Sequence, residues 1–443
     1  MPAMFGTDGV RGTPGQSPLD ARTIARLGAA TARVMGPRGA KLLAVRDTRE
    51  SGPWIEQQLA RGVVYEGGQL VSAGILPTPA GAFLAASAGF DGALVISASH
   101  NAFPDNGIKV LNADGEKVSH GLEAELQNRV ADNSWEISEP VAAVVEKRNF
   151  TNNYCAHVSR VLADCDFVPP LRLAVDCANG AMWEVAPKVL RQLGFNVLTM
   201  NVNPDGRNIN ANCGSTHSED LQKFVKERHC QLGIAFDGDG DRAILVDHQG
   251  VVVDGDAMLF ICARFLQSRA KLPKSAVVAT VMSNIGLEVA LRVEGVELHR
   301  CQVGDRQVRD AMVERGIALG GEQSGHLIFS DFLPTGDGLL TALSIINVVC
   351  QTGQNLVELC SGLEVYPQVL VNVPVRIKPD LSSEPNLADV VQSAERMLGS
   401  NGRVLVRYSG TEPLLRVMIE GKDLETVQQL AESIAIRARQ LLG

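Results

Sequence analysis

Residues 232–246 read Leu-Gly-Ile-Ala-Phe-Asp-Gly-Asp-Gly-Asp-Arg-Ala-Ile-Leu-Val, so two apolar runs enclose a loop in which acidic residues alternate with glycines. Short apolar runs bounded by turn residues are typical of buried strands. The three carboxylates of the loop, on Asp237, Asp239 and Asp241, can turn towards one cation, and their hard oxygens suit Mg²⁺ or Ca²⁺. We therefore expect a metal-binding loop between two strands; a solvated acidic turn is the alternative, which the apolar flanks disfavour.

Several common binding motifs do not fit this chain. An EF-hand calcium loop needs Gly at its sixth position and Glu at its twelfth, where this loop has Arg242 and His248. The sequence contains neither G-x-G-x-x-G nor a Walker loop, so dinucleotide and P-loop ATP sites lack support. It also lacks the G-x-S-x-G elbow of the α/β-hydrolases.

The pattern of strand, polar loop and strand occurs twice more, at Ala93–Val110 and Ile317–Phe329. Further strands are expected at Leu42–Arg46, Leu171–Asp176, Asn196–Met200, Ala276–Val281 and Val296–Cys301. Amphipathic helices are expected at Pro53–Glu66, Ala181–Leu193, Thr216–Arg228 and Asp305–Arg315. This alternation is typical of βαβ units, with mostly parallel sheets and helices on both faces. We therefore expect an α/β fold of three similar mixed α/β domains around a central cleft.

The last part of the chain has a different pattern. It shows strands at Gln368–Arg376, Arg403–Arg407 and Leu415–Glu420, followed by a helix at Leu424–Leu442, which indicates a smaller C-terminal α+β domain. The expected domains are 1–140, 141–248, 249–363 and 364–443, and each is expected to carry one functional loop. A hinge is expected near Ser361–Pro367.

Composition limits the classes of function. The chain has 443 residues, 45% of them hydrophobic, and a formal charge of 41 − 50 = −9 without a long basic run, so a nucleic-acid partner is not expected. Its nine cysteines include no C-x-x-C pair, which indicates reduced thiols rather than zinc or a disulfide framework. No apolar run reaches the roughly 20 residues of a membrane span, and no signal-peptide pattern is visible, so we expect a cytoplasmic protein.

Three other polar segments carry residues suited to chemistry. Ser97-Ala98-Ser99-His100-Asn101 follows an apolar strand, where α/β proteins place their sites, although an ordinary Ser/Asn turn is the alternative. Gly320-Gly321-Glu322-Gln323-Ser324-Gly325-His326 offers groups for sugar hydroxyls and proton transfer. Arg407-Tyr408-Ser409-Gly410-Thr411-Glu412-Pro413, with Arg416 following, resembles an anion nest. A polar turn is the alternative for the second segment and a capped strand–turn junction for the third.

These segments, in this order, resemble the four signature loops of the α-D-phosphohexomutase family over essentially the whole chain. The start Gly6-Thr7-Asp8-Gly9-Val10-Arg11-Gly12, the stretch from Asn203 through His217, and Ala279–Asn284 resemble the branch that converts glucosamine 6-phosphate into glucosamine 1-phosphate. One departure is Ala102, where family members usually have proline after Ser-His-Asn; Pro104 follows two residues later.

The resemblance implies a role for each matching residue. Ser99 would be the phosphoserine and a ligand of Mg²⁺ together with Asp237, Asp239 and Asp241. The groups around the transferring phosphoryl would be Arg11, His100, Lys109 and Arg242. Sugar contacts would come from Glu322, Ser324 and His326, with Gly304, Asp305 and Arg306 in the same cleft. The phosphate that does not react would be held by Arg407, Ser409, Gly410, Thr411 and Arg416.

The implied enzyme is an intramolecular phosphotransferase that works through a sugar 1,6-bisphosphate, which also serves as its activator. It would supply UDP-N-acetylglucosamine and cell-wall precursor synthesis. We expect Lys109 to be the general base and acid, with His326 as second choice. The alternatives are a phosphoglucomutase/phosphomannomutase, a metal-dependent phosphatase and a non-catalytic sugar-phosphate sensor. The oligomeric state stays open, with a homodimer as one option.

Overall fold

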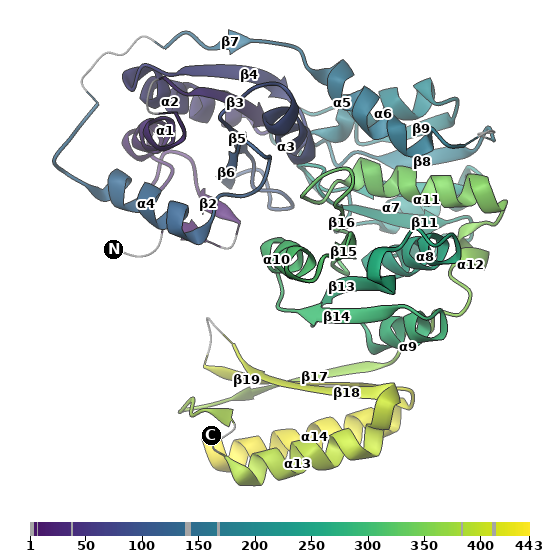
Figure 1. The fold of residues 1–443 in the computed structure, drawn as a ribbon. Helices are drawn as coiled ribbons and strands as arrows, with labels where there is room; N and C mark the ends of the chain where they lie inside the picture. Colours follow the sequence, from purple (N-terminus) through teal and green to yellow (C-terminus); the bar gives the residue numbers. More distant parts are fainter. Residues whose placement is uncertain are drawn as a thin grey trace. The chain divides into compact units, whose positions relative to one another are not determined.

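The computed structural model describes residues 4–6, 8–36, 39–137, 143–165, 169–381, 384–409 and 413–443. The chain forms two compact units. The first comprises Met1–Val281 and His299–Ser361, and the second comprises Met282–Leu298 and Gly362–Gly443. In both units, strands and helices alternate along the chain (Figure 1).

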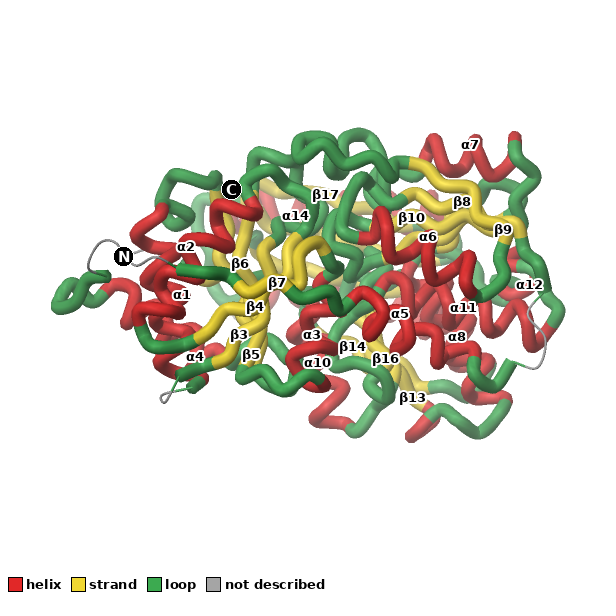
Figure 2. Tube along the Cα trace, turned by 90° about the horizontal axis from the view of Figure 1, so that it is seen from above, coloured by secondary structure: helices red, strands yellow, loops and turns green. Residues whose placement is uncertain are grey.

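The first sheet has the strand order β1-β2-β6-β5-β3-β4-β7. Its strands are β1 Phe5–Gly6, β2 Gly9–Gly12, β3 Lys41–Arg46, β4 Gln69–Ile75, β5 Gly92–Ile96, β6 Asn106–Asn112 and β7 Glu146–Lys147. Its helices are α1 Ala21–Met35, α2 Gly52–Tyr65, α3 Thr78–Ser87 and α4 His120–Ala131. Strands β3, β4 and β5 lie side by side and run parallel (Figure 2). The sheet packs on a core that includes Ile24, Leu42, Leu94 and Ile108, all of which are fully buried.

The second sheet belongs to the first unit, and so does the third, apart from Glu297 and Leu298 at the start of β14. The second, β12-β11-β10-β8-β9, is made of β8 Arg172–Asp176, β9 Asn196–Met200, β10 Leu232–Phe236, β11 Ala243–Asp247 and β12 Val252–Val253, with helices α5 Thr151–Ser159, α6 Met182–Gln192 and α7 Glu219–Glu227. The third, β14-β13-β15-β16, is made of β13 Ala276–Thr280, β14 Glu297–Cys301, β15 Leu319–Gly321 and β16 Leu327–Phe329, with helices α8 Gly255–Ser268, α10 Asp305–Arg315, α11 Gly338–Thr352 and α12 Leu356–Leu359.

Each of the three polar loops joins two antiparallel neighbours: β5 to β6, β10 to β11, and β15 to β16. On its other side, the strand before the loop pairs in parallel with β3, β8 or β13. The expected repetition is therefore present, but the expectation of mostly parallel sheets was only half right. A short loop can connect only antiparallel neighbours, because a parallel pair needs a long crossover.

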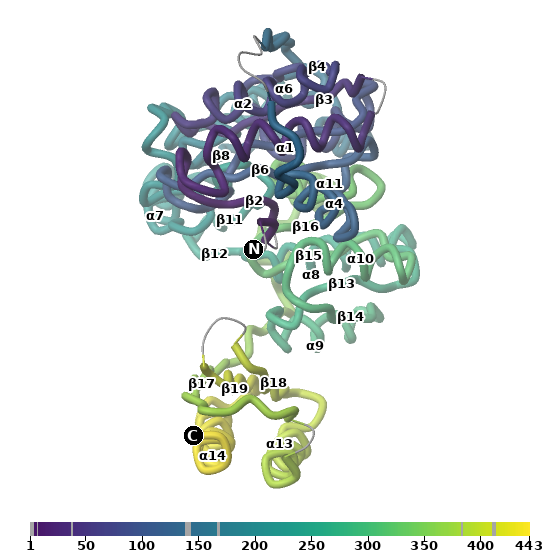
Figure 3. Tube along the Cα trace, turned by 90° about the vertical axis from the view of Figure 1, so that its left-hand side faces the viewer, coloured from purple at the N-terminus to yellow at the C-terminus, as the bar shows by residue number. Residues whose placement is uncertain are grey.

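The second unit contains the sheet β17-β19-β18, formed by β17 Gln368–Pro374, β18 Gly402–Tyr408 and β19 Leu414–Gly421 in antiparallel pairing. Its helices are α9 Ile285–Val293, α13 Pro385–Leu398 and α14 Leu424–Leu442. Helices α13 and α14 cover one face of the sheet (Figure 3). The sequence pattern did not indicate α13.

Buried hydrogen bonds and an ion pair link helix α9 to the sheet of the second unit. Asn284, the N-cap of α9, donates to the carbonyl oxygen of Tyr366 at 2.9 Å. Arg403 pairs with the fully buried Glu420 at 2.7 Å and donates to the carbonyl oxygen of Ser283 at 3.2 Å. A buried carboxylate is tolerated when it is paired in this way. The segment Met282–Leu298 therefore belongs to the second unit.

Two general properties of the described residues concern membranes and cysteines. No helix in the described part of the chain has the length and apolar character of a bilayer span. The described residues include all nine cysteines, and no disulfide bond joins any of them.

Glycines set the spacing between α1 and α2, and they give a test of the packing. A Cβ atom at Gly62 would lie 1.8 Å from the carbonyl oxygen of Ala25, and one at Gly28 would lie 2.3 Å from that of Leu59. Alanine normally favours a helix interior over glycine by about 0.5–1 kcal/mol. We expect Gly62→Ala to lower the free energy of unfolding by about 1–3 kcal/mol instead of raising it, because α1 and α2 must separate to admit the new Cβ atom.

The matched control for this substitution is Gly121→Ala in α4, where a new Cβ would meet only the hydroxyl of Ser119 at 3.9 Å. Thermal unfolding should show a lower melting temperature for Gly62→Ala and an unchanged or higher one for Gly121→Ala. Equal melting temperatures would contradict the close approach of α1 and α2.

Asp337 supports a prediction about pH. Its fully buried carboxylate caps α11 by accepting the backbone N–H groups of Leu339 and Leu340 at 3.0 Å, and Tyr154 of α5 donates to it at 2.9 Å. Burial raises the pKa of Asp337 to about 6, although these hydrogen bonds oppose the shift. The folded state therefore holds this proton more tightly than the unfolded state does. The stability that results is complete below the unfolded pKa near 4 and is lost as the pH rises through 6.

We expect this group alone to make the protein about 3 kcal/mol less stable at pH 7 than at pH 4. Asp337→Asn cannot titrate, so the melting temperature of the native protein relative to this variant should fall from pH 4 to pH 7. Titrating groups that do not interact with Asp337 cancel in this comparison. If the native protein's melting temperature relative to Asp337→Asn rose from pH 4 to pH 7, the three hydrogen-bond donors to Asp337 would stabilise its anion more than burial destabilises it.

Candidate active site

The structure brings Ser99 to the acidic loop. Ser99 lies three residues after the end of β5 and is 2% exposed, with a left-handed backbone at φ = 49°. Its N–H donates to the hydroxyl of Ser97 at 2.9 Å, and its own Oγ donates to Oδ2 of Asp237 at 2.6 Å. A hydroxyl from the first sheet and a carboxylate from the second are therefore in direct contact.

The three acidic side chains form a compact group. Asp237, Asp239 and Asp241 are all buried, and each offers an oxygen within 4.8 Å of the other two. Thr78, the first residue of α3, donates to Asp239 through both its N–H and its hydroxyl. In the described part of the chain, no hydrogen bond reaches the buried Oδ1 atoms of Asp239 and Asp241. Orphaned carboxylate oxygens of this kind fit a hard divalent cation.

Lys109 of β6 supplies positive charge to the same carboxylates. Its Nζ lies 2.9 Å from Asp239, 3.3 Å from Asp241 and 3.4 Å from Asp8. Burial alone would lower the pKa of Lys109, but the carboxylates of Asp239, Asp8 and Asp241 outweigh it and raise the pKa well above its usual value. Lys109 is therefore an ammonium ion in this site, the form that gives a proton or neutralises charge.

The neighbouring carboxylates respond in opposite ways. Burial, together with the charges of Asp241 and Asp239, raises the pKa of Asp237 well above its usual range. Burial would also raise the pKa of Asp241, but Lys109, His326 and other partners lower it well below that range. Like charges this close cannot all persist without compensation, so without a cation the proton belongs on Asp237.

Cationic and imidazole side chains lie beside the acidic loop and at His100, the residue after Ser99. Arg242, which follows Asp241, lies 3.5 Å from Nδ1 of His100. Burial and the charges of Arg242 and Arg11 lower the pKa of His100, so its imidazole is neutral near pH 7. Arg11 of β2 contacts both the carboxylate and the carbonyl oxygen of Asp8. The structure thus brings together the residues predicted around the transferring phosphoryl group.

The side chains of the loop between β15 and β16 point in different directions. Oε1 of Glu322 accepts the N–H of Gly304 at 3.1 Å, and Ser324 is exposed. His326 is 1% exposed; its Nε2 accepts the N–H of Gly336 at 3.1 Å, and its Nδ1 faces Asp241 at 3.7 Å. His326 therefore turns towards the acidic loop, and its predicted contact with a sugar hydroxyl stays a prediction, as do those of Glu322 and Ser324.

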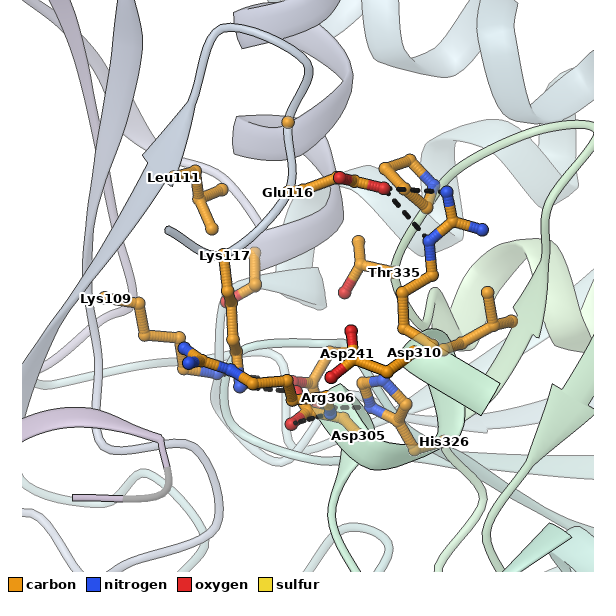
Figure 4. Close-up of a pocket in the computed structure, with 15 residues that line it drawn as sticks. Lys109, Leu111, Glu116, Lys117, Asp241, Asp305, Arg306, Asp310, His326 and Thr335 are labelled. Carbon is orange, nitrogen blue, oxygen red and sulfur yellow. Dashed lines mark hydrogen bonds and ion pairs between the residues drawn. The ribbon is translucent and has the colours of Figure 1, made fainter. Parts of the chain in front are cut away.

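A cavity of about 70 Å³ lies beside Lys109, Asp241 and His326. Figure 4 shows Asp241 and His326 next to each other and an ion pair between Lys117 and Asp305 of α10. Lys117 also contacts Asp8 at 2.6 Å, and Asp8 in turn contacts Lys109. Alternating charges thus run from α10 to the acidic loop.

The predicted phosphate nest lies in the second unit. Arg407 of β18 and Arg416 of β19 are direct cross-strand partners, and Ser409 is 3% exposed. Like charges opposite each other are unfavourable, so such a pair suits an anion. Gly410 and Thr411 lie outside the described residues.

Sequence reasoning did not single out several residues at this site. They are Asp8, Arg49, Thr78, Lys117 and Asn210. A signal did exist for Arg49, because Asp47-Thr48-Arg49 follows β3, the parallel neighbour of β5, at the same edge of the sheet. Asn210 lies within the stretch Asn203–His217 that carries the family resemblance, although nothing in the sequence assigns it a role, and Lys117 carries no comparable local signal.

Comparison with known proteins shows the family to which the chain belongs. Family models of phosphoglucomutase/phosphomannomutase match α/β/α domain I at residues 2–136, domain II at 152–250, domain III at 254–366 and the C-terminal domain at 370–437. A phosphoglucosamine mutase of Solibacter usitatus is 43% identical over 447 aligned positions and covers 99% of both chains.

Solved structures give the same result. A phosphoglucomutase/phosphomannomutase family protein of Burkholderia thailandensis has a TM-score of 0.82 at 25% identity, with 99% of this chain and 97% of that chain covered. An N-acetylphosphoglucosamine mutase of Aspergillus fumigatus, in complex with GlcNAc-6P and magnesium, has a TM-score of 0.69 at 17% identity, with 99% and 95% covered, and supports the fold alone. The chain therefore belongs to the phosphoglucomutase/phosphomannomutase family, as three α/β domains and a C-terminal domain, and is an isomerase of the phosphoglucosamine mutase type.

Proposed function

We propose that this enzyme interconverts glucosamine 6-phosphate and glucosamine 1-phosphate through a phosphoserine at Ser99 and a 1,6-bisphosphate intermediate. The observation that carries the proposal is the 2.6 Å contact between Ser99 Oγ and Asp237, beside two buried carboxylate oxygens that accept no hydrogen bond from the described residues. The choice of an amino sugar rests on the relative named phosphoglucosamine mutase.

Magnesium fits the acidic loop. Asp237, Asp239 and Asp241 would hold it, with an oxygen of phosphoserine 99 as a further ligand. A bound Mg²⁺ would neutralise charge on the phosphoryl group during transfer. The buried orphan oxygens of Asp239 and Asp241 support this assignment.

The chain's own residues supply the rest of the chemistry. In the first step the bond between Ser99 Oγ and phosphorus breaks, and a bond forms between phosphorus and the free sugar hydroxyl oxygen. Lys109, which is charged here, gives its proton to the departing Oγ and takes one from the sugar hydroxyl, so protons balance. The second step reverses this sequence with the other phosphate. Arg11, His100 and Arg242 surround the phosphoryl group, and positioning with charge neutralisation supplies most of the rate.

The remaining assignments belong to the same proposal. Glu322, Ser324, His326, Gly304 and Asp305 would contact the sugar, and Arg407, Ser409, Gly410, Thr411 and Arg416 would hold the phosphate that does not react. The enzyme would work in the cytoplasm and supply UDP-N-acetylglucosamine and cell-wall precursors. The four expected domains, 1–140, 141–248, 249–363 and 364–443, would each carry one of these loops, and a homodimer remains an option for the assembly.

The first test replaces the proposed phosphoserine. Ser99→Ala should lower the formation of glucosamine 1-phosphate about a thousandfold or more, even with added sugar 1,6-bisphosphate, because no group can hold the phosphoryl in transit. Intact-mass analysis should find one phosphoryl group on the native protein and none on the variant. Ser87→Ala, an exposed serine of α3, is the control. Near-native turnover by Ser99→Ala would sink the proposal.

The same assay separates the rival substrates. Comparison of kcat/KM for glucosamine, glucose and mannose phosphates should favour the amino sugar. A preference for glucose or mannose phosphate would indicate a phosphoglucomutase/phosphomannomutase instead. Steady release of inorganic phosphate would indicate a phosphatase, and binding without Ser99 phosphorylation would indicate a sensor.

The second test concerns the metal. Asp239→Asn removes one of three carboxylates, so Mg²⁺ affinity measured by calorimetry should fall at least about tenfold, and activity should fall with it. The melting temperature without metal should change little. Asp114→Asn, at an exposed aspartate, is the control. Unchanged Mg²⁺ affinity would contradict the assignment, and a large loss of melting temperature that appears only in the presence of Mg²⁺ would indicate a structural ion.

A further inference from the structure

The loop that carries Ser99 is held by a buried arginine. Arg49 is 1% exposed and pairs through Nε with Asp47 at 2.9 Å. Its Nη2 donates to the carbonyl oxygens of Ser99 at 3.0 Å and Asn101 at 2.8 Å. Its Nη1 donates to two further carbonyl oxygens of the same loop, those of Ala102 and Asp105. All five N–H groups of the guanidinium are therefore used, four of them on this one loop.

Asn210 reaches the same carbonyl oxygens from the second sheet's side. Its Nδ2 donates to Ser99 at 2.9 Å and to Asn101 at 3.0 Å. A Cβ atom at Gly238, in the acidic loop, would lie 2.5 Å from the Ser99 carbonyl oxygen and 2.7 Å from Nδ2 of Asn210. Gly238 is thus the point at which the acidic loop meets both the Ser99 loop and Asn210, and there is no room for a side chain at position 238.

Further contacts join the segment that carries Arg49 to Asn179 and to the segment that carries Asn210. The hydroxyl of Thr48 donates to the carbonyl oxygen of Asn179 at 2.6 Å, and the N–H of Glu50 donates to that of Gly206 at 3.0 Å. Glu50 also pairs with Arg207 at 2.8 Å. The two segments therefore form one joint between the first and second sheets, and the Ser99 carbonyl lies at its buried end.

We propose that Arg49 and Asn210 are positioning residues that act on the Ser99 carbonyl oxygen and fix the distance between the phosphoserine and the acidic loop. Ser99 has a left-handed backbone, which a non-glycine residue keeps only when its surroundings impose it. Two donors on its carbonyl and one acceptor on its N–H impose it here. The Ser99 side chain can then rotate only about its own Cα–Cβ bond.

This inference rests on the proposed phosphoryl exchange. Both half-reactions use the same Oγ atom and the same carboxylates, so an error in their spacing would slow both. A displacement of about 1 Å can cost roughly 100-fold in rate. Neither Arg49 nor Asn210 needs to touch the sugar, so KM for the substrate should change little while kcat falls.

The experiment uses substitutions that the backbone tolerates. Asn210 has φ = 57°, so Asn210→Gly removes the amide without strain, and Asn210→Asp keeps the shape but sets an acceptor against two carbonyl oxygens. The matched control is Asn212→Gly, an exposed residue of the same loop with φ = 53°. Single-turnover phosphorylation of Ser99 by the sugar 1,6-bisphosphate is followed by intact mass, with Mg²⁺ affinity and melting temperature measured alongside.

We expect Asn210→Gly to slow phosphorylation of Ser99 about 10- to 100-fold, Asn210→Asp to slow it more, and Asn212→Gly to match the native protein. Mg²⁺ affinity should be unchanged in all three. A native protein that never becomes phosphorylated would overturn the proposed function itself. A phosphorylated native protein whose Asn210 variants react within about twofold of Asn212→Gly, or whose Asn210 variants lose only melting temperature, would overturn this inference alone.

Discussion

The site depends on the contact of the Ser99 hydroxyl with Asp237, one of three buried carboxylates whose charges must be balanced. Three acidic side chains lie within 4.8 Å of one another, and burial makes each uncompensated charge costly. Lys109 and Arg242 provide the balancing charge, and a proton on Asp237 removes part of the remainder. A divalent cation would also balance these negative charges, so the same three carboxylates determine both the charge balance of the loop and its chemistry.

The fold produces this concentration of charge by repeating one piece of topology. Each polar loop starts at a strand that is parallel to one neighbour and ends at a strand that is antiparallel to the first. The loop is therefore a direct connection between neighbouring strands, and it emerges at the carboxyl edge of a buried strand. Helix α3 then brings Thr78 to Asp239, and β6 brings Lys109 to the same carboxylate. Residues that are 130 or more positions apart in the chain become neighbours in this way.

Much of this could be predicted from the sequence, because the informative residues are local. The acidic loop, the Ser99 loop and most strand bounds follow from short patterns, and Asp305–Arg315 is helical as expected. Contacts that depend on packing between sheets could not be predicted. Arg49 and Asn210 look like ordinary polar residues until the two sheets meet. The orientation of His326 likewise depends on Gly336, ten residues later, which leaves just enough room for the imidazole.

The left-handed backbone of Ser99 also limits the choice of nucleophile. A hydroxyl could be supplied in principle by threonine, but a β-branched residue at positive φ crowds its own carbonyl and is a true outlier in proteins. The carbonyl of residue 99 cannot rotate away, since Arg49 and Asn210 hold it. Threonine is thus excluded by backbone shape rather than by reactivity, and the fold accepts only the unbranched alcohol at this position.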